Sequence, residues 1–129
     1  MTSEGADHAA DDVAALERAW QAEPLRRELS SLAIAAGRQL FLVGGAVRDL
    51  LLGREVDDWD VAGHDMIELA SRFAREQHLR VVILHEHFPT ARVILHPGAP
   101  AGYLDFVELR APTLEEDLRA RDFLSLIHI

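Results

Sequence analysis

The chain contains no cysteine and no lysine among its 129 residues. Without cysteine it can form no disulfide, thiolate nucleophile or cysteine-based zinc site, which is compatible with a reducing compartment. Without lysine, and with a formal net charge of -9, it lacks the clustered positive charge with which proteins hold a nucleic-acid backbone. Any nucleic-acid partner would therefore have to be held mainly by segments missing from this chain.

Long hydrophobic runs are also absent. No stretch reaches the roughly 18 apolar residues of a membrane-spanning helix, and the acidic N-terminus lacks the basic and apolar regions of a signal peptide. The sequence thus predicts a cytoplasmic protein with no membrane partner. Hydrophobic residues make up 49% of the chain, enough for one domain with a modest core.

The apolar pattern divides the chain into an acidic leader at residues 1–22, partly disordered or helical, and a domain body at 23–123. Apolar spacing and capping signals predict helices at 11–21, 24–36, 47–52, 66–78 and 113–119, and strands at 39–43, 58–62, 80–84, 91–95 and 103–109. The predicted fold class is a mixed α/β (α+β) domain, with a sheet of about five strands flanked by helices.

A double glycine, Gly44-Gly45, separates the first predicted strand from a short helix that carries Arg48. Backbone amides at such a turn suit phosphate oxygens, glycine permits close approach, and the arginine fork can reach a phosphate. The sequence therefore predicts nucleotide-binding roles for these three residues. A purely structural turn explains the two glycines equally well when they are considered alone.

Two carboxylates, Asp58 and Asp60, alternate along the next predicted strand. Alternation places both on one face, about 6 to 7 Å apart at Cα, while Trp59 faces the other way. Such a pair either raises the pKa of one member or binds a cation, and Mg²⁺ takes carboxylates together with substrate phosphates. An exposed acidic strand end is the alternative for an isolated Asp-x-Asp.

Asp105 is a candidate third carboxylate, in a strand that could lie beside the Asp58 strand, whereas Glu108 falls on the opposite face. A solvent-facing position on an edge strand remains open for Asp105. His85 and His87 alternate around Glu86, but they lie in a turn-like run and we assign them no metal.

The sequence from Leu42 to Asp60 resembles the head domain of class II nucleotidyltransferases, the family of tRNA CCA-adding enzymes and bacterial poly(A) polymerases. The block Leu-Val-Gly-Gly-Ala-Val-Arg-Asp-Leu-Leu-Leu-Gly at 42–53, followed by Asp-Trp-Asp at 58–60, carries the likeness. Residues 88–93 and 113–123 match two further family motifs, so the resemblance covers about 39–123.

The resemblance implies transfer of AMP or CMP from ATP or CTP to an RNA 3′-hydroxyl by two-metal magnesium catalysis, with tRNA 3′-CCA addition favoured over poly(A) addition. Asp58 and Asp60 would hold Mg²⁺ and, with Asp105, form the catalytic set. Gly45 and Arg48 would contact the triphosphate, and Arg121 would approach the nucleotide.

The chain departs from the family pattern in three places. Pro89 stands where the family has glycine, Ala120 replaces the first arginine of Arg-Arg-Asp, and residues 124–129 replace the expected continuation. We expect 124–129 to be a non-native or truncated tail, and the fragment to be inactive alone because the base-selecting neck and body are absent. The alternative function is a noncatalytic nucleotide-sensing or RNA-associated module that keeps the fold.

Overall fold

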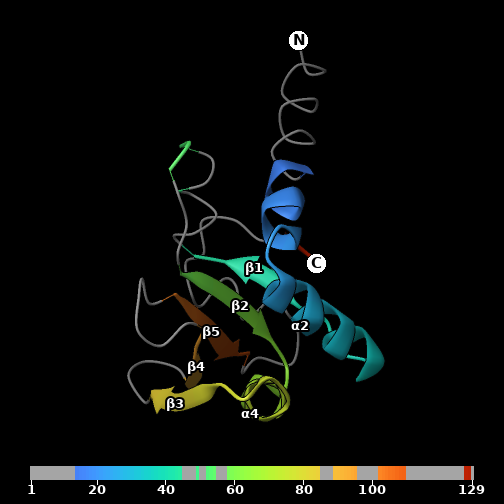
Figure 1. Cartoon of the computed structure of the whole chain (residues 1–129), viewed down its shortest axis with the longest axis vertical. Helices are drawn as coiled ribbons and strands as arrows, with labels where there is room; N and C mark the ends of the chain where they lie inside the picture. Colours follow the sequence, from blue (N-terminus) through green and yellow to red (C-terminus); the bar gives the residue numbers. More distant parts are fainter. Residues whose placement is uncertain are drawn as a thin grey trace.

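A computed structural model describes residues 14–44, 49, 52–54, 58–84, 89–95 and 102–109, together with the backbone of 127–128. These residues form one mixed sheet with the strand order β3-β4-β5-β2-β1-β6 (Figure 1). The strands are β1 (Phe41–Val43), β2 (Trp59–Gly63), β3 (Arg80–Leu84), β4 (Thr90–Ile94), β5 (Tyr103–Glu108) and β6 (Ile127–His128), and the helices are α2 (Pro24–Ala35) and α4 (Met66–Gln77).

The neighbouring strands β2 and β5 are parallel, whereas the other described pairs are antiparallel. This confirms the predicted mixed sheet flanked by helices. The sixth strand, β6, was not predicted, because two residues carry too little pattern to indicate a strand.

The predicted elements agree with the described ones to within one or two residues at most ends. Residues 14–21 are helical, as their apolar spacing predicted. The predicted helix at 47–52 has only Asp49 and Leu52 within the described residues, and the one at 113–119 lies outside them.

The main core lies between the helices and one face of the sheet. Leu16 and Trp20 from the first helical segment are buried there with Phe73 of α4 and Phe106 of β5. The Trp20 and Trp59 rings meet edge-on, with centroids 5.6 Å apart. Since Trp59 separates Asp58 from Asp60 in the chain, this contact fixes the side of the sheet to which β2 turns each residue.

The guanidinium of Arg26 in α2 stacks on this tryptophan pair. It lies 4.9 Å from the Trp59 ring centroid and donates hydrogen bonds to the carbonyl oxygens of Trp20 and Ala19. Burial lowers its pKa, partly offset by the charge of Glu23. The arginine thereby joins the first helical segment, α2 and β2 into one packed unit.

Helix α2 ends at Ala35, and Gly37, two residues later, is the stop residue that the sequence predicted. Gly37 has φ +69°, and the amides of Gly37 and Arg38 donate to the carbonyls of Ile34 and Ala33. These two bonds make a Schellman motif, in which a left-handed residue satisfies the last helical carbonyls. The turn sends the chain directly into β1.

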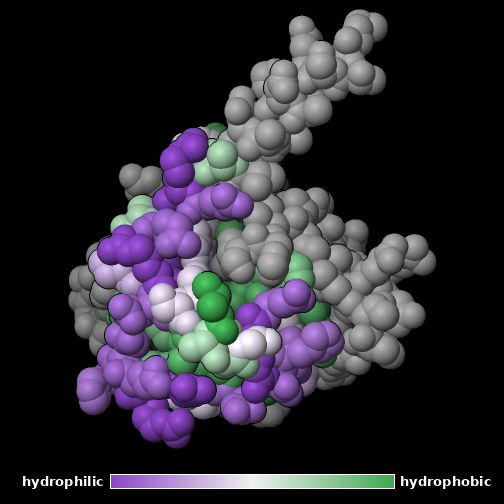
Figure 2. All heavy atoms as spheres, turned by 90° about the vertical axis from the view of Figure 1, so that its right-hand side faces the viewer, coloured by the Kyte–Doolittle hydropathy of each residue, from purple (hydrophilic) through white to green (hydrophobic). Residues whose placement is uncertain are grey.

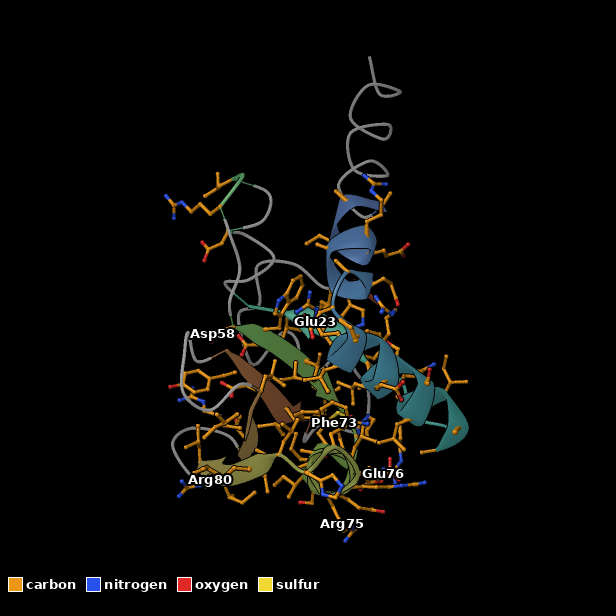
Figure 3. All side chains as sticks on the ribbon, viewed as in Figure 1. Glu23, Asp58, Phe73, Arg75, Glu76 and Arg80 are labelled. Atoms are coloured by element: carbon orange, nitrogen blue, oxygen red, sulfur yellow. The ribbon has the colours of Figure 1, made fainter. Side chains whose placement is uncertain are left out.

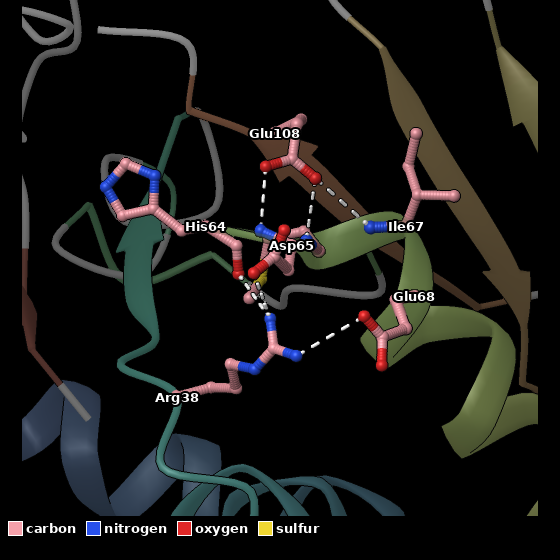
Figure 4. Close-up of polar contacts among 7 residues, drawn as sticks. Arg38, His64, Asp65, Ile67, Glu68 and Glu108 are labelled. Atoms are coloured by element: carbon pink, nitrogen blue, oxygen red, sulfur yellow. Dashed lines mark hydrogen bonds and ion pairs between the residues drawn. The ribbon is translucent and has the colours of Figure 1, made fainter. Parts of the chain in front are cut away.

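Helix α4 begins over the end of β5, where Glu108 caps it (Figure 4). The Glu108 carboxylate accepts hydrogen bonds from the backbone amides of Asp65 at 2.8 Å and Met66 at 2.7 Å. Arg38 pairs with Asp65 at 2.7 Å and with Glu68 at 3.4 Å. A carboxylate at a helix N-terminus satisfies otherwise unpaired amides, so this cluster anchors α4 to the sheet.

The orientation of α4 follows from its amphipathic sequence. Figure 3 shows Phe73 pointing toward the sheet, whereas Arg75 and Glu76 point away from it. On the face of the molecule seen from the right of Figure 1, hydrophilic residues surround a small hydrophobic group (Figure 2).

None of the described helices is long and apolar enough to cross a membrane.

Candidate functional site

Strand alternation places Asp60 and Asp105 on the sheet face opposite the helices. Trp59 and Val61 are buried in the main core at 2% and 0% exposure, so Asp60 between them turns to the other face. Asp60 is paired with Asp105 in the parallel β2–β5 register. The expectation that the Asp105 strand lies beside the Asp58 strand is therefore confirmed.

Asp60 and Asp105 are both partly buried, and Asp60 has the shifted pKa. Its pKa is raised to about 6, first by burial and then by the charge of Asp105, while Arg92 lowers it and Asp58 raises it. No hydrogen bond or ion pair to its carboxylate is found among the described residues. The pKa of Asp60 is raised in the direction expected for paired carboxylates, although burial contributes more than the charge of either neighbouring aspartate.

Asp58 lies just before β2 and is exposed. Figure 3 shows it at the start of that strand. Its Oδ1 accepts a hydrogen bond of 3.0 Å from the backbone amide of Tyr103. This bond ties the beginning of β2 to the beginning of β5 and orients one carboxylate oxygen of Asp58.

Asp105 is held by Arg92 of β4, the residue opposite it in the antiparallel register. Arg92 Nε donates to Oδ1 at 2.9 Å, and Nη2 donates to Oδ2 at 3.0 Å. The same guanidinium lies 4.6 Å from the Tyr103 ring centroid. The pKa of Arg92 is raised, first by its hydrogen bonds to Asp105.

Gly44 closes the site at the end of β1, where Val43 pairs with Asp60. It has φ +81°, and a Cβ at this position would lie 2.7 Å from Asp60 Oδ2. The positive φ favours glycine, and an added Cβ would force the Asp60 carboxylate to shift. The other predicted nucleotide-binding residues, Gly45, Arg48 and Arg121, lie outside the described residues.

The donor set fits a hard divalent cation. Asp60 supplies a carboxylate that has no ion pair among the described residues, and Asp58 supplies a second carboxylate two residues earlier in the chain. Carboxylate oxygens are ligands that Mg²⁺ prefers. No group of three His, Cys, Asp or Glu side chains able to hold a metal ion occurs within the described part of the chain. A magnesium hypothesis therefore rests on Asp58 and Asp60.

Sequence reasoning missed Arg92 as part of the site. The signal was available, because Arg92 stands between Ala91 and Val93, both buried at 0% exposure, and alternation turns it to the carboxylate face. The residues at 97–100 predict a turn between the strands of Arg92 and Asp105, but that turn does not by itself set the register that places these two residues opposite each other. The candidate histidines His85 and His87 lie outside the described residues.

A depression at the other end of β2 is a separate feature. It has a volume of about 350 Å³ and is lined by Gly37, Arg38, Gln39, Phe41, Gly63, His64 and Leu109. Arg38 is already paired with Asp65 and Glu68, so the depression presents no uncompensated charge of the kind found at Asp60.

Comparison with known proteins identifies the family and the relatives that this chain resembles. Residues 40–125 match the family model of the Poly A polymerase head domain. The CC-adding tRNA nucleotidyltransferase of Shouchella clausii (strain KSM-K16) is 39% identical over 90 residues, which are 69% of this chain and 22% of that protein. The CC-adding tRNA nucleotidyltransferase of Synechocystis sp. (strain ATCC 27184 / PCC 6803 / Kazusa) is 43% identical over 88 residues, 66% of this chain and 20% of that protein.

Among solved structures, the fold is similar to a crystal structure of tRNA nucleotidyltransferase complexed with a primer tRNA and an incoming ATP analog. The similarity has a TM-score of 0.62 at 31% identity and covers 78% of this chain and 34% of that one. The chain spans about a fifth of the length of the curated relatives it matches, 22% and 20%. Its sequence and fold together show that the chain belongs to the Poly A polymerase head-domain family.

Proposed function

We propose that this chain is the catalytic head of an RNA nucleotidyltransferase, which binds the magnesium-bound triphosphate of ATP or CTP at Asp58 and Asp60. The observation that carries the proposal is Asp60, a partly buried carboxylate with a raised pKa that lies opposite Asp105 in a parallel register. Family membership supports nucleotide transfer as the use of this site.

The reaction would be attack of an RNA 3′-hydroxyl on the α-phosphate of the nucleotide, with pyrophosphate as leaving group. Bound Mg²⁺ would neutralise phosphate charge, and a second ion would extend this to the attacking oxygen. Asp58 and Asp60 would hold the cation, and β2 and the Tyr103 amide fix the positions of these two residues. Because Gly44 has no side chain, the Asp60 Oδ2 atom can lie close to the backbone at residue 44.

The RNA substrate we propose is a tRNA 3′ end, with CCA-type addition ahead of poly(A) addition. The names of the two curated relatives and the bound primer tRNA of the structural relative support this choice. Because the chain has a net charge of -9, we propose that segments outside it supply most of the grip on RNA.

Binding of MgATP to the 129-residue chain tests the nucleotide site. We expect Asp58→Ala/Asp60→Ala to weaken MgATP binding by at least about tenfold, because both cation ligands are lost. Glu76→Gln is the matched control, since it removes a carboxylate that points away from the sheet on α4 (Figure 3). Unchanged affinity in the double variant would overturn the proposal, and titration calorimetry gives the measurement.

A further inference from the structure

Arg92 occupies a position that affects which carboxylates can reach a cation. It lies on β4, separated from Asp60 by β5, and its guanidinium contacts both oxygens of Asp105. The side chain is 36% exposed and that of Asp105 is 15% exposed. The carboxylate of Asp105 is thus largely shielded while Arg92 is partly exposed, and the two parallel bonds fix the carboxylate plane.

We propose that Arg92 is a positioning residue that holds Asp105 outside the coordination shell of the cation and so limits the protein ligands to Asp58 and Asp60. The inference rests on the proposed function, because it presumes that this pair binds a divalent cation. Asp105 contributes its charge to the site, while its oxygens stay with the guanidinium.

Three observations support this division of roles. Both Asp105 oxygens accept hydrogen bonds from Arg92, at 2.9 and 3.0 Å. The Tyr103 ring lies 4.6 Å from the same guanidinium, which holds the arginine against the sheet and limits its freedom to release Asp105. The Asp60 carboxylate, by contrast, has no hydrogen bond or ion pair among the described residues, although the backbone of Asp60 is paired within the sheet.

The division has a chemical consequence for the substrate. Mg²⁺ demands six oxygen ligands, and in nucleotide sites it commonly takes one or two carboxylates plus phosphates and water. A third carboxylate in the shell would occupy a position that a phosphate oxygen needs. By holding Asp105, Arg92 leaves that position to the triphosphate.

Direct binding of Mn²⁺, followed by the electron paramagnetic resonance of the free ion, tests the inference without requiring turnover. We expect Arg92→Met to bind Mn²⁺ about 3- to 10-fold more tightly than the wild type, because a positive charge leaves the site and Asp105 is freed to coordinate. A loss of packing alone would weaken binding, so the direction separates positioning from a merely structural role.

Four further variants serve as controls for the Mn²⁺ affinity of Arg92→Met. Arg75→Met removes the same charge from an α4 side chain that points away from the sheet (Figure 3), and should leave Mn²⁺ affinity unchanged. Arg92→Lys keeps the charge but loses the two-bond fork, so its affinity should fall between those of wild type and Arg92→Met. Asp105→Asn should weaken binding, and the double variant Arg92→Met/Asp105→Asn should lose the gain.

The two ways of failing are distinguishable. If Mn²⁺ binding depends on Asp58 and Asp60 but Arg92→Met and Arg92→Lys bind no more tightly than the wild type, the Arg92 inference is overturned and the proposed function stands. If Asp58→Asn/Asp60→Asn leaves Mn²⁺ binding unchanged, the proposed function fails, and the inference fails with it. Thermal unfolding of each variant identifies any that does not fold, and Arg92→Lys then decides the outcome.

Discussion

Two ionic clusters lie at opposite ends of the β2–β5 pair, and their charge balance differs. At one end, Glu108 caps α4 through backbone amides, and Arg38 pairs with Asp65 and Glu68. At the other, burial raises the pKa of Asp60, and the charges of Asp105 and Asp58 raise it further.

The difference separates a structural cluster from a candidate site. The α4 cluster gives each carboxylate a donor, which is what anchoring a helix requires. The aspartate end leaves Asp60 without a counter-ion among the described residues, and Arg92 is committed to Asp105. An uncompensated negative charge in a partly buried position destabilises the folded protein. A carboxylate kept there at such a cost is therefore a candidate ligand for a cation.

Among the variants that test the difference between the two clusters, Asp60→Asn in the metal-free chain should change the free energy of unfolding most. The pKa of Asp60 is raised from 3.8 to about 6, so its favourable contribution to folding is complete below about pH 4 and is lost as pH rises through about 6. The variant should therefore match the wild type in acid and exceed its free energy of unfolding by about 2 kcal/mol at pH 8, allowing for partial exposure.

Urea denaturation at pH 4 and pH 8 measures this difference. With saturating Mn²⁺ at pH 8 the advantage of Asp60→Asn should shrink or reverse, since the ion stabilises only the wild type. A variant that is less stable than the wild type at both pH values would show that Asp60 is compensated like the carboxylates of the α4 cluster.

Gly44→Ala should give the next largest effect, and Gly53→Ala is its matched control. Both glycines have positive φ, +81° and +76°, but only at Gly44 would a Cβ meet Asp60 Oδ2, at 2.7 Å, whereas nothing lies within 4 Å at Gly53. Each substitution should cost about 1–2 kcal/mol of stability from backbone strain. Only Gly44→Ala should also displace the Asp60 carboxylate and weaken Mn²⁺ binding, by about tenfold.

Chemical denaturation and Mn²⁺ titration of both glycine variants provide the two measurements. Equal Mn²⁺ affinities for Gly44→Ala and Gly53→Ala would mean that Asp60 can rotate away from the added methyl group at no cost to the site.

Glu108→Gln should produce the smallest effect, and on stability alone. The change removes the negative charge at the start of α4 and replaces one acceptor by an amide donor, which should cost about 1 kcal/mol. Mn²⁺ affinity should stay at the wild-type value, because Glu108 and Asp105 are on opposite faces of the sheet. A change in Mn²⁺ affinity comparable to that of Asp105→Asn would show that the two ends of β5 are not independent.

Much of the site was predictable because alternation is a local property. The pattern around Asp58 and Asp60 indicated one shared face, and the burial of Trp59 and Val61 agrees with it. The same rule separated Asp105 from Glu108. What could not be predicted was Arg92, since its role depends on the register of β4 against β5.

The sequence by itself determined the helix and strand types, the ends at Gly37 and Gly44, and the family motifs, because each depends on residues that are near neighbours in the chain. The tertiary structure decided which residues lie opposite one another on neighbouring strands. No local pattern specified the parallel register of Asp60 with Asp105 or the antiparallel register of Asp105 with Arg92. The raised pKa of Asp60 follows from that packing, because burial and neighbouring charge exist only when the strands are assembled.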